Sequence, residues 1–222
     1  MAEAIALAYR MNMHDDVRTA STGVDHTEIQ LRRRTFWHLY AIDKTEASSG
    51  TPSMMNDHEG LCSLPLEVDD DFITAQGSFP QPPQRTSIMV GFVAVSKLFK
   101  IMSEVLFRHR CVQARFHLSS VWESDPLPGE SGQSDMESII VRESEWIVRA
   151  HDRIREVLDG LPPDLATQRG ESGMGTIDPR GLSPDSSAIF GMQVANCLIT
   201  AASVQFALVS SPLGCAPTER SS

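Results

Sequence analysis

Residue types that commonly do chemistry are present in this chain, but their spacing matches no catalytic or metal-binding arrangement. The cysteines form no Cys-x-x-Cys pair and stand at no spacing from histidine that would hold zinc. The seven histidines form no His-Glu-x-x-His motif. We therefore predict no catalytic residue, no metal ligand and no cofactor in this chain. The cysteines are Cys62, Cys111, Cys197 and Cys215.

Two other candidates for chemistry are better explained as loop features. Residues 129–132 and 170–173 both read Gly-Glu-Ser-Gly, which resembles a nucleophile elbow but is not Gly-x-Ser-x-Gly. The aspartates at 69–71 would attract a cation, although a solvated acidic loop or a helix cap is the commoner role of such a run. An enzyme is therefore the disfavoured interpretation.

Asp43 is the charged residue whose position calls for a specific explanation. A helix is predicted to start at Asp25 or Thr27, either of which can cap it, and to end in the breaker-rich stretch at 48–52. Asp43 lies on the apolar face of this helix, where a carboxylate is costly unless it is paired. Arginines of the same helix are too far away, so we expect a partner from another helix. The apolar residues of this face are Ile29, Phe36, Tyr40 and Ala47.

The consecutive arginines at 32–34 and the Phe36-Trp37 pair each allow two interpretations. Three neighbouring side chains point in different directions around a helix, so packing and ion pairing are favoured over a nucleic-acid patch. The aromatic pair is better explained as core than as a platform for a ligand.

This segment resembles the signature of the fungal-specific transcription factor domain, the middle homology region of Zn₂Cys₆ regulators. The pattern is Arg-Arg-x-Phe-Trp-x-x-(Tyr/Phe)-x-x-Asp-(Arg/Lys), followed by Gly-x-Pro and Leu-Pro. Residues 4–16 and 191–206 are similar to an early and a late helix of that family. Thr51 departs from the pattern, since the family usually has arginine there. The matching residues are Arg33, Arg34, Phe36, Trp37, Tyr40, Asp43, Lys44, Gly50, Pro52, Leu64 and Pro65.

The resemblance implies a metabolite-responsive regulatory domain that modulates transcription by RNA polymerase II in the nucleus. It implies protein partners, either the transcription machinery or a second copy of the chain, and no membrane. DNA and zinc would be bound only by an N-terminal cluster ahead of Met1. The alternatives are an adaptor protein without DNA binding and, third, an all-α enzyme.

Composition agrees with a regulatory domain that does not itself hold nucleic acid. The chain has 222 residues, of which 41% are hydrophobic, enough to bury a core. Its net charge of −10 opposes binding to a polyanion. We therefore expect a soluble intracellular protein that touches DNA only indirectly.

The remaining sequence predicts helices separated by loops rich in proline, glycine and serine. Apolar residues repeat at helical spacing from Ser87 to about Arg110, and again from Met136 to Leu158. No strand-like alternation is visible. The predicted fold is all-α, a bundle-like and incomplete domain spanning 1–222 as one unit. Flexible loops are predicted at 111–135 and 162–187.

Residues 188–209 contain no charged residue and are long enough to span a bilayer. A polar stripe along this segment disfavours lipid contact, so we predict a helix packed in the bundle. Its packing residues should be Phe190, Val194, Leu198 and Ala201, set against the helix of Phe36 or that of Phe99. The stripe is also a candidate effector cavity, formed by Gln193, Asn196, Thr200 and Ser203.

Overall fold

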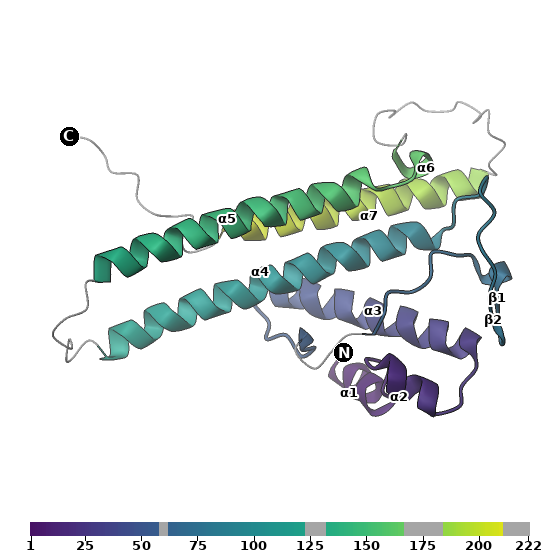
Figure 1. The fold of residues 1–222 in the computed structure, drawn as a ribbon, viewed down its shortest axis with the longest axis horizontal. Helices are drawn as coiled ribbons and strands as arrows, with labels where there is room; N and C mark the ends of the chain where they lie inside the picture. Colours follow the sequence, from purple (N-terminus) through teal and green to yellow (C-terminus); the bar gives the residue numbers. More distant parts are fainter. Residues whose placement is uncertain (58–61, 123–131, 167–183, 211–222) are drawn as a thin grey trace.

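The structure, a computed structural model, describes residues 1–57, 62–122, 132–166 and 184–210 and confirms the all-α prediction (Figure 1). Its long helices are α3 (His26–Ser48), α4 (Met89–Trp122), α5 (Gly132–Asp159) and α7 (Pro184–Val209). The short helices are α1 (Ala2–Arg10), α2 (Asp16–Ser21) and α6 (Pro163–Ala166). Strands β1 (Ile73–Thr74) and β2 (Gly77–Ser78) pair antiparallel, with Ile73 opposite Ser78.

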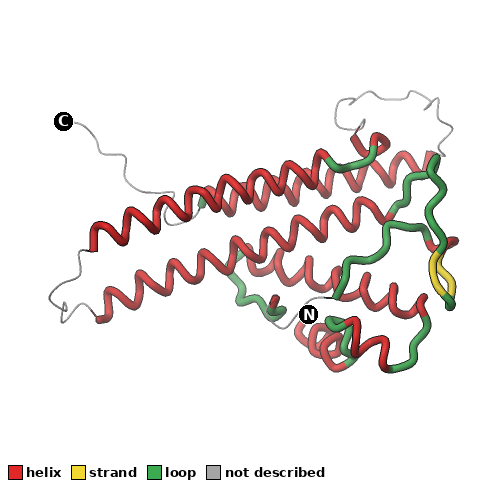
Figure 2. Tube along the Cα trace, in the orientation of Figure 1, coloured by secondary structure: helices red, strands yellow, loops and turns green. Residues whose placement is uncertain are grey.

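α4 is the central helix, because other helices pack on more than one of its sides. α5 and α7 run alongside α4 and pack with it around a shared apolar core (Figure 1). α3 packs on another side of α4, and α1 and α2 lie against α3 (Figure 2). The long connection between α3 and α4 therefore passes where these two groups of helices meet.

α3 begins and ends as its sequence predicts. The Asp25 carboxylate caps the helix by accepting the Glu28 N–H at 2.8 Å. The helix ends at Ser48, and Gly50 takes a φ of 98°, which a residue with a Cβ rarely adopts. Phe36 and Trp37 are 0% and 1% exposed, so the core interpretation of this pair is confirmed.

α7 packs on α4, the helix that carries Phe99, as predicted for the uncharged segment. Leu198 was expected in the contact but is 39% exposed. Cys197 is buried instead, because it continues an alternating spacing of four and three residues along one face. We call this buried row the inner seam. The inner seam consists of Phe190, Val194, Cys197, Ala201, Val204 and Leu208.

Parts of both predicted loops are helical. Residues 111–122 continue α4, because this stretch contains no proline or glycine to end the helix. The second predicted loop contains α6 and the first turn of α7. The loop predictions for 123–131 and 167–183 lie outside the described residues. Helix α2 was not predicted from the sequence. Asp15 caps this helix by accepting hydrogen bonds from the N–H groups of Val17 and Arg18.

Candidate functional site

The buried pair Asp43 and Lys44 binds the loop that follows α3. Asp43 accepts the Met54 N–H at 2.7 Å and the Ser53 hydroxyl at 2.6 Å. Lys44 Nζ donates to the Met55 carbonyl oxygen at 2.5 Å and lies 3.2 Å from Asp43 Oδ2. Asp43 is 3% exposed and Lys44 2%, so the predicted burial and pairing of Asp43 are confirmed. The partner is not on another helix, however, but on the adjacent residue and the next loop.

Tyr40, one turn before the pair, extends the same polar cluster. Its hydroxyl lies 3.0 Å from each carboxylate oxygen of Asp57 and donates to that group. Burial, together with the charge of Asp57, raises the pKa of Tyr40 and keeps the hydroxyl protonated. Lys44 Nζ lies 3.8 Å from Asp57 and 4.7 Å from the centre of the Tyr40 ring. The lysine charge is thus surrounded by two carboxylates and an aromatic face.

Hydrogen bonds decide the ionisation of Asp43. Burial by itself raises the pKa of this carboxyl. The Ser53 hydroxyl, the Met54 N–H and the Lys44 charge outweigh burial and leave the pKa below its usual value. Asp43 is therefore a charged structural group at neutral pH rather than a proton donor or acceptor in a reaction.

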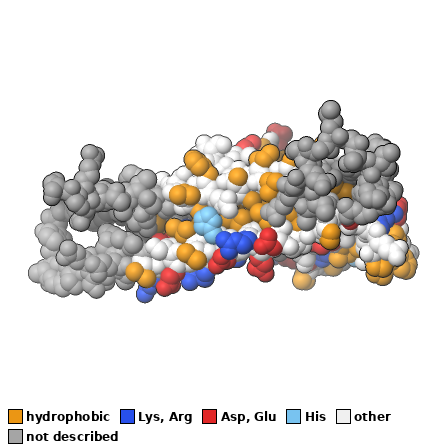
Figure 3. Space-filling model, turned by 90° about the horizontal axis from the view of Figure 1, so that it is seen from above, with side chains coloured by type: hydrophobic (Ala, Val, Ile, Leu, Met, Phe, Trp, Pro, Cys, Tyr) orange, Lys and Arg blue, Asp and Glu red, His pale blue; other side chains and the backbone are white. Residues whose placement is uncertain are grey.

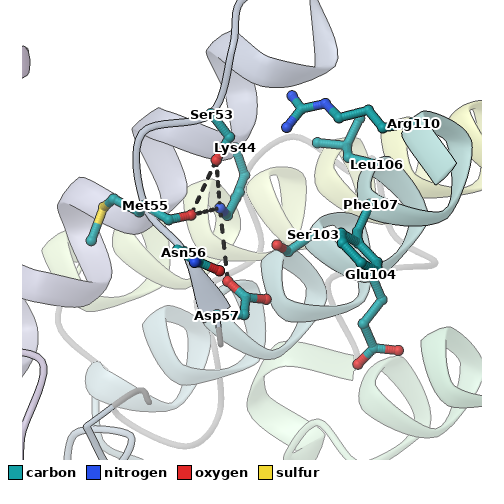
Figure 4. Close-up of a pocket in the computed structure, with 10 residues that line it drawn as sticks. All are labelled: Lys44, Ser53, Met55, Asn56, Asp57, Ser103, Glu104, Leu106, Phe107 and Arg110. Carbon is teal, nitrogen blue, oxygen red and sulfur yellow. Dashed lines mark hydrogen bonds and ion pairs between the residues drawn. The ribbon is translucent and has the colours of Figure 1, made fainter. Parts of the chain in front are cut away.

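A cavity of about 330 Å³ opens beside this cluster, between the loop and α4 (Figure 4). Lys44, Ser53 and Asp57 line it from the α3 side, and Ser103 and Arg110 line it from α4 (Figure 4). The cavity wall also includes Met55, Asn56, Glu104, Leu106 and Phe107.

The charges at this cavity differ in how firmly they are held. Arg153 of α5 makes a two-pronged pair with Glu104, with distances of 2.5 and 2.9 Å. Arg110 makes one long contact, 3.5 Å from Nη2 to the Thr51 carbonyl oxygen. The arrangement provides an accessible guanidinium next to hydroxyls and a carboxylate, which suits binding of a small polar molecule.

The remaining signature residues fix α3 to its surroundings. Arg33 pairs with Asp16 at 2.9 Å, and Arg34 pairs with Asp70 at 2.5 Å. Arg32 pairs with Glu28 at 2.8 Å, so each arginine of the run has a carboxylate partner, as predicted.

The aromatic signature residues are held in the core in the same way. Trp37 Nε1 donates to the Ser63 carbonyl oxygen at 3.0 Å, and its ring meets the Tyr40 ring edge-on at 5.2 Å. Beyond Gly50, Pro52 starts the loop that Asp43 and Lys44 hold. Within the signature, Tyr40, Asp43 and Lys44 position the loop at residues 53–57. The arginines and Trp37 instead fix α3 to Asp16, Asp70 and Ser63.

The predicted stripe on α7 lies only partly at a cavity. Gln193 and Asn196 line a space of about 370 Å³ together with residues of α3 and α4. Thr200 is buried, whereas Ser203 is exposed and donates to the Ile199 carbonyl oxygen of its own helix. Thr200 and Ser203 are not among the residues that line this cavity, so within the stripe Gln193 and Asn196 are the candidates for contact with an effector there.

Gln193 makes a close contact where α7 approaches the start of α4. Its Nε2 donates to the Ile88 carbonyl oxygen. Its side chain lies directly over Gly91, where an added Cβ would be 2.5 Å from Gln193 Oε1 and 2.8 Å from Gln193 Cβ. Glycine at this position therefore makes room for the glutamine.

Two further properties of the described residues bear on function. Within the described ranges, no group of three His, Cys, Asp or Glu side chains could hold a metal ion, so these residues do not fit a zinc cluster. The helix segment Ala188–Val209 is long and apolar enough to cross a bilayer, with a mean hydropathy of 1.5 over an 18-residue window, of which 33% is buried. Its inner seam packs against α4, as the core helix of a folded domain does.

The signature residues lie within a stretch of the chain that is similar to a known protein family. Residues 1–147, more than half of the chain, match the family described as the fungal specific transcription factor domain. The chain belongs to this family. The match ends within α5, so the likeness of residues 191–206 to a late helix of the family stays a prediction.

One curated relative of this fungal transcription factor domain is the Transcriptional activator protein acu-15 of Neurospora crassa. It is 26% identical over 128 residues, which cover 57% of this chain and 14% of that protein. The chain thus spans a small part of its relative's length. No solved structure matches the chain. The matched family is a transcription factor domain of fungi, and the relative is named as a transcriptional activator.

The sequence analysis did not identify the residues that surround the buried Asp43–Lys44 pair and the cavity. Ser53 and Asp57 contact the buried pair, and Arg110 lies across the cavity on α4. The first two have a recognisable signal, because an Asp-Lys pair at the end of a helix needs partners in the loop that follows. Arg110 has no signal in the sequence, because its place depends on how α4 packs against α3.

Proposed function

We propose that this chain is the regulatory domain of a Zn₂Cys₆-type transcription regulator, and that a small metabolite in the cavity beside Asp57 and Arg110 controls its output in the nucleus. The observation that carries the proposal is the double role of Lys44. Lys44 is part of the cavity wall, and its Nζ holds the Met55 carbonyl oxygen and the Asp43 carboxylate. A molecule that contacts the lysine therefore acts on the packing of the loop and α3.

The cavity favours one class of ligand. Arg110 offers a guanidinium that can pair with a carboxylate or phosphate, and the Ser53 and Ser103 hydroxyls offer further donors. Asp57 is placed to accept a hydrogen bond from a hydroxyl or amine. We infer a small anionic metabolite that also carries a hydroxyl or amino group.

Binding of such a ligand would change transcription through the α3–α4 contact. Ser53 belongs to the loop that Lys44 holds to α3, and Arg110 belongs to α4, so a ligand bridging Ser53 and Arg110 favours the arrangement in which α3 and α4 are close. A ligand shifts an equilibrium only as far as it binds one arrangement better than the other. Regulation would then consist of a change in the population of the closed α3–α4 arrangement.

A reporter assay tests this function. The chain is fused to an unrelated DNA-binding domain, and reporter output is measured in fungal cells grown on different nutrient sources. We expect output to depend on the nutrient, and Arg110→Ala to remove that dependence. Arg149→Ala is the matched control, because Arg149 makes only a surface pair with Glu145 on α5. A nutrient response that survives Arg110→Ala would contradict the ligand assignment.

The adaptor alternative differs in its relation to DNA. A regulator needs a zinc cluster in the same polypeptide, whereas an adaptor pairs with a regulator that has one. The coding sequence upstream of Met1 decides between them. A Cys-x₂-Cys-x₆-Cys spacing there supports the proposed regulator, and a stop codon in frame without it supports the adaptor.

A further inference from the structure

α7 has a second apolar row on the side opposite its inner seam. Four large side chains of this row are strongly exposed: Met192 by 65%, Ile199 by 66%, Phe206 by 75% and Val209 by 67%. Two exposed alanines lie between them at spacings that alternate between three and four residues. We call this row the outer seam. The outer seam consists of Met192, Ala195, Ile199, Ala202, Phe206 and Val209.

The spacing of the outer seam is that of a helix prepared to pair with another helix. Apolar residues alternating by three and four make the contact line of a coiled coil. The inner seam of the same helix has this spacing and packs on α4. We therefore expect a second row with the same spacing to pack against another helix as well. Seen from above the view of Figure 1, the surface shows hydrophobic side chains among uncharged ones, with charged side chains mainly along the lower edge (Figure 3). An exposed apolar row of this length marks an interaction surface.

We propose that the outer seam joins two copies of this chain as an antiparallel pair of α7 helices. The order of large and small residues supports this arrangement. When two outer seams run in opposite directions, Met192 faces Val209 of the second copy. Ala195 then faces Phe206, and Ile199 faces Ala202, so every alanine meets a larger side chain.

The parallel arrangement fits poorly by comparison. There, each residue meets its own copy, so Phe206 opposes Phe206 while Ala195 opposes Ala195. Large pairs would hold the helices apart and small pairs would leave gaps, which interiors avoid. The outer seam is thus complementary to itself only about a twofold axis across the helix, as an isologous interface requires.

Charge also favours the outer seam as the contact between copies. Each chain carries a net charge of −10, so two copies repel over most of their surfaces. Residues 188–209 carry no charge, and Asn196 and Ser203 flank the outer seam with neutral hydrogen-bonding groups. Two acidic chains can therefore approach along this helix without burying an ion.

The expected dimer is reversible. The outer seam is about 26 Å long at 1.5 Å per residue, and a helix pair of that length buries less than the about 800 Å² per partner of a standard interface. Val141 and Val148 are also exposed, on the neighbouring α5. Dimerisation through α7 requires no ligand in the cavity at Arg110.

Sedimentation equilibrium of the whole chain over a range of concentrations tests the proposal. We expect a monomer–dimer equilibrium that Phe206→Glu weakens by at least about tenfold, because a carboxylate would face apolar side chains. Phe79→Glu is the matched control, since Phe79 is 61% exposed and is not part of the outer seam, and should leave the equilibrium unchanged. Circular dichroism confirms that both variants keep their helices. A monomer at all concentrations, or a dimer that persists in Phe206→Glu, would overturn the proposal.

Disulfide trapping tests the orientation in a chain with Cys111→Ser and Cys215→Ser. A mixture of Ala195→Cys and Phe206→Cys chains should cross-link mainly to each other, whereas a parallel pair would give cross-links between identical chains. Flotation with neutral phosphatidylcholine vesicles examines the other occupant of an apolar helix. Chain that floats with the vesicles, and loses this in Phe206→Glu, would assign the outer seam to lipid and overturn the dimer.

Discussion

Asp43 and Lys44 are neighbours in sequence, and both are buried against the loop that follows α3. Asp43 binds this loop as a hydrogen-bond acceptor and Lys44 binds it as a donor. The carboxylate accepts the Met54 N–H, whereas the ammonium donates to the Met55 carbonyl oxygen. The Ser53 hydroxyl completes the arrangement by donating to Asp43 and accepting from Lys44. The same contacts therefore neutralise the two charges and hold the loop. Removing either residue affects both the charge balance and the attachment of the loop.

Removing the Asp43 carboxylate should destabilise the chain strongly. Asp43→Ala leaves the Lys44 charge buried with fewer partners, and breaking such a pair costs about 3–5 kcal/mol. Urea unfolding followed by circular dichroism measures the loss. Glu46→Ala, an exposed position on the same helix, is the control and should change the free energy of unfolding by less than about 0.5 kcal/mol. A loss for Asp43→Ala as small as that of the control would show that the pair is not structural.

Acid should weaken the chain through the same carboxylate. The pKa of Asp43 is lower in the folded chain than its ordinary value of 3.8, and the pKa values of Asp16 and Asp69 are shifted in the same direction. Such groups stabilise the fold fully above the unfolded pKa, and this contribution is lost as the pH falls through the folded pKa. We therefore expect the free energy of unfolding to decrease below about pH 4.

Asp43→Asn isolates the share of this acid sensitivity that belongs to Asp43. The variant should be less stable than the native chain at pH 7, because Lys44 loses its counter-charge. The difference should narrow as the pH falls below about 4, since protonation removes the same charge from the native chain. Urea midpoints between pH 3 and pH 7 measure the difference. A gap of constant size over that range would assign the acid loss to other groups.

The contact of Gly91 with Gln193 predicts an unusual response to alanine. Alanine is a better helix former than glycine by about 1 kcal/mol, so Gly91→Ala ought to stabilise α4. We expect the opposite, because the new Cβ would lie 2.5–2.8 Å from atoms of Gln193, including its Cβ. Gln193→Ala removes the outer part of that side chain and should recover part of the loss. Thermal unfolding of the two single variants and the double variant measures this coupling, and additive effects would contradict the contact.

The isolated chain should not bind duplex DNA specifically. Its net charge of −10 opposes association with phosphates, and each arginine at 32–34 is already paired with a carboxylate. A mobility-shift titration at near-physiological salt is the measurement. Saturable, sequence-dependent binding tighter than about 10⁻⁷ M would contradict the prediction, since specific recognition lies in that range.

Much of α3 could be predicted from sequence because its information is local. The cap at Asp25, the stop at Gly50 and the buried aromatic face all follow from residues within one helix. Burial and pairing of Asp43 followed from its position on that face. The source of its partners did not, because helical spacing says nothing about a loop that turns back onto its own helix.

The long helices show where local information ends. The helical spacing predicted from Ser87 to about Arg110 does not tell which apolar residues are buried, since Ile88 is 45% exposed whereas Leu98 and Val105 are 0% exposed. A single-face pattern fails for α4 because α3 lies on one of its sides and α5 and α7 on another. The cavity with Arg110 depends on the same packing and was equally hidden from a periodicity argument.

Gly91 also determines how far α7 can slide along α4. A seam with a seven-residue period is almost degenerate, since displacement by one heptad again sets apolar residues against apolar residues. The glutamine that fits over Gly91 occurs once on the contact face of α7, and α4 has no second glycine along its length. The contact between Gly91 and Gln193 therefore selects one alignment of α4 and α7 among several that would bury similar amounts of apolar surface. Without it, we expect a population of slipped packings with native helix content but no single tertiary structure.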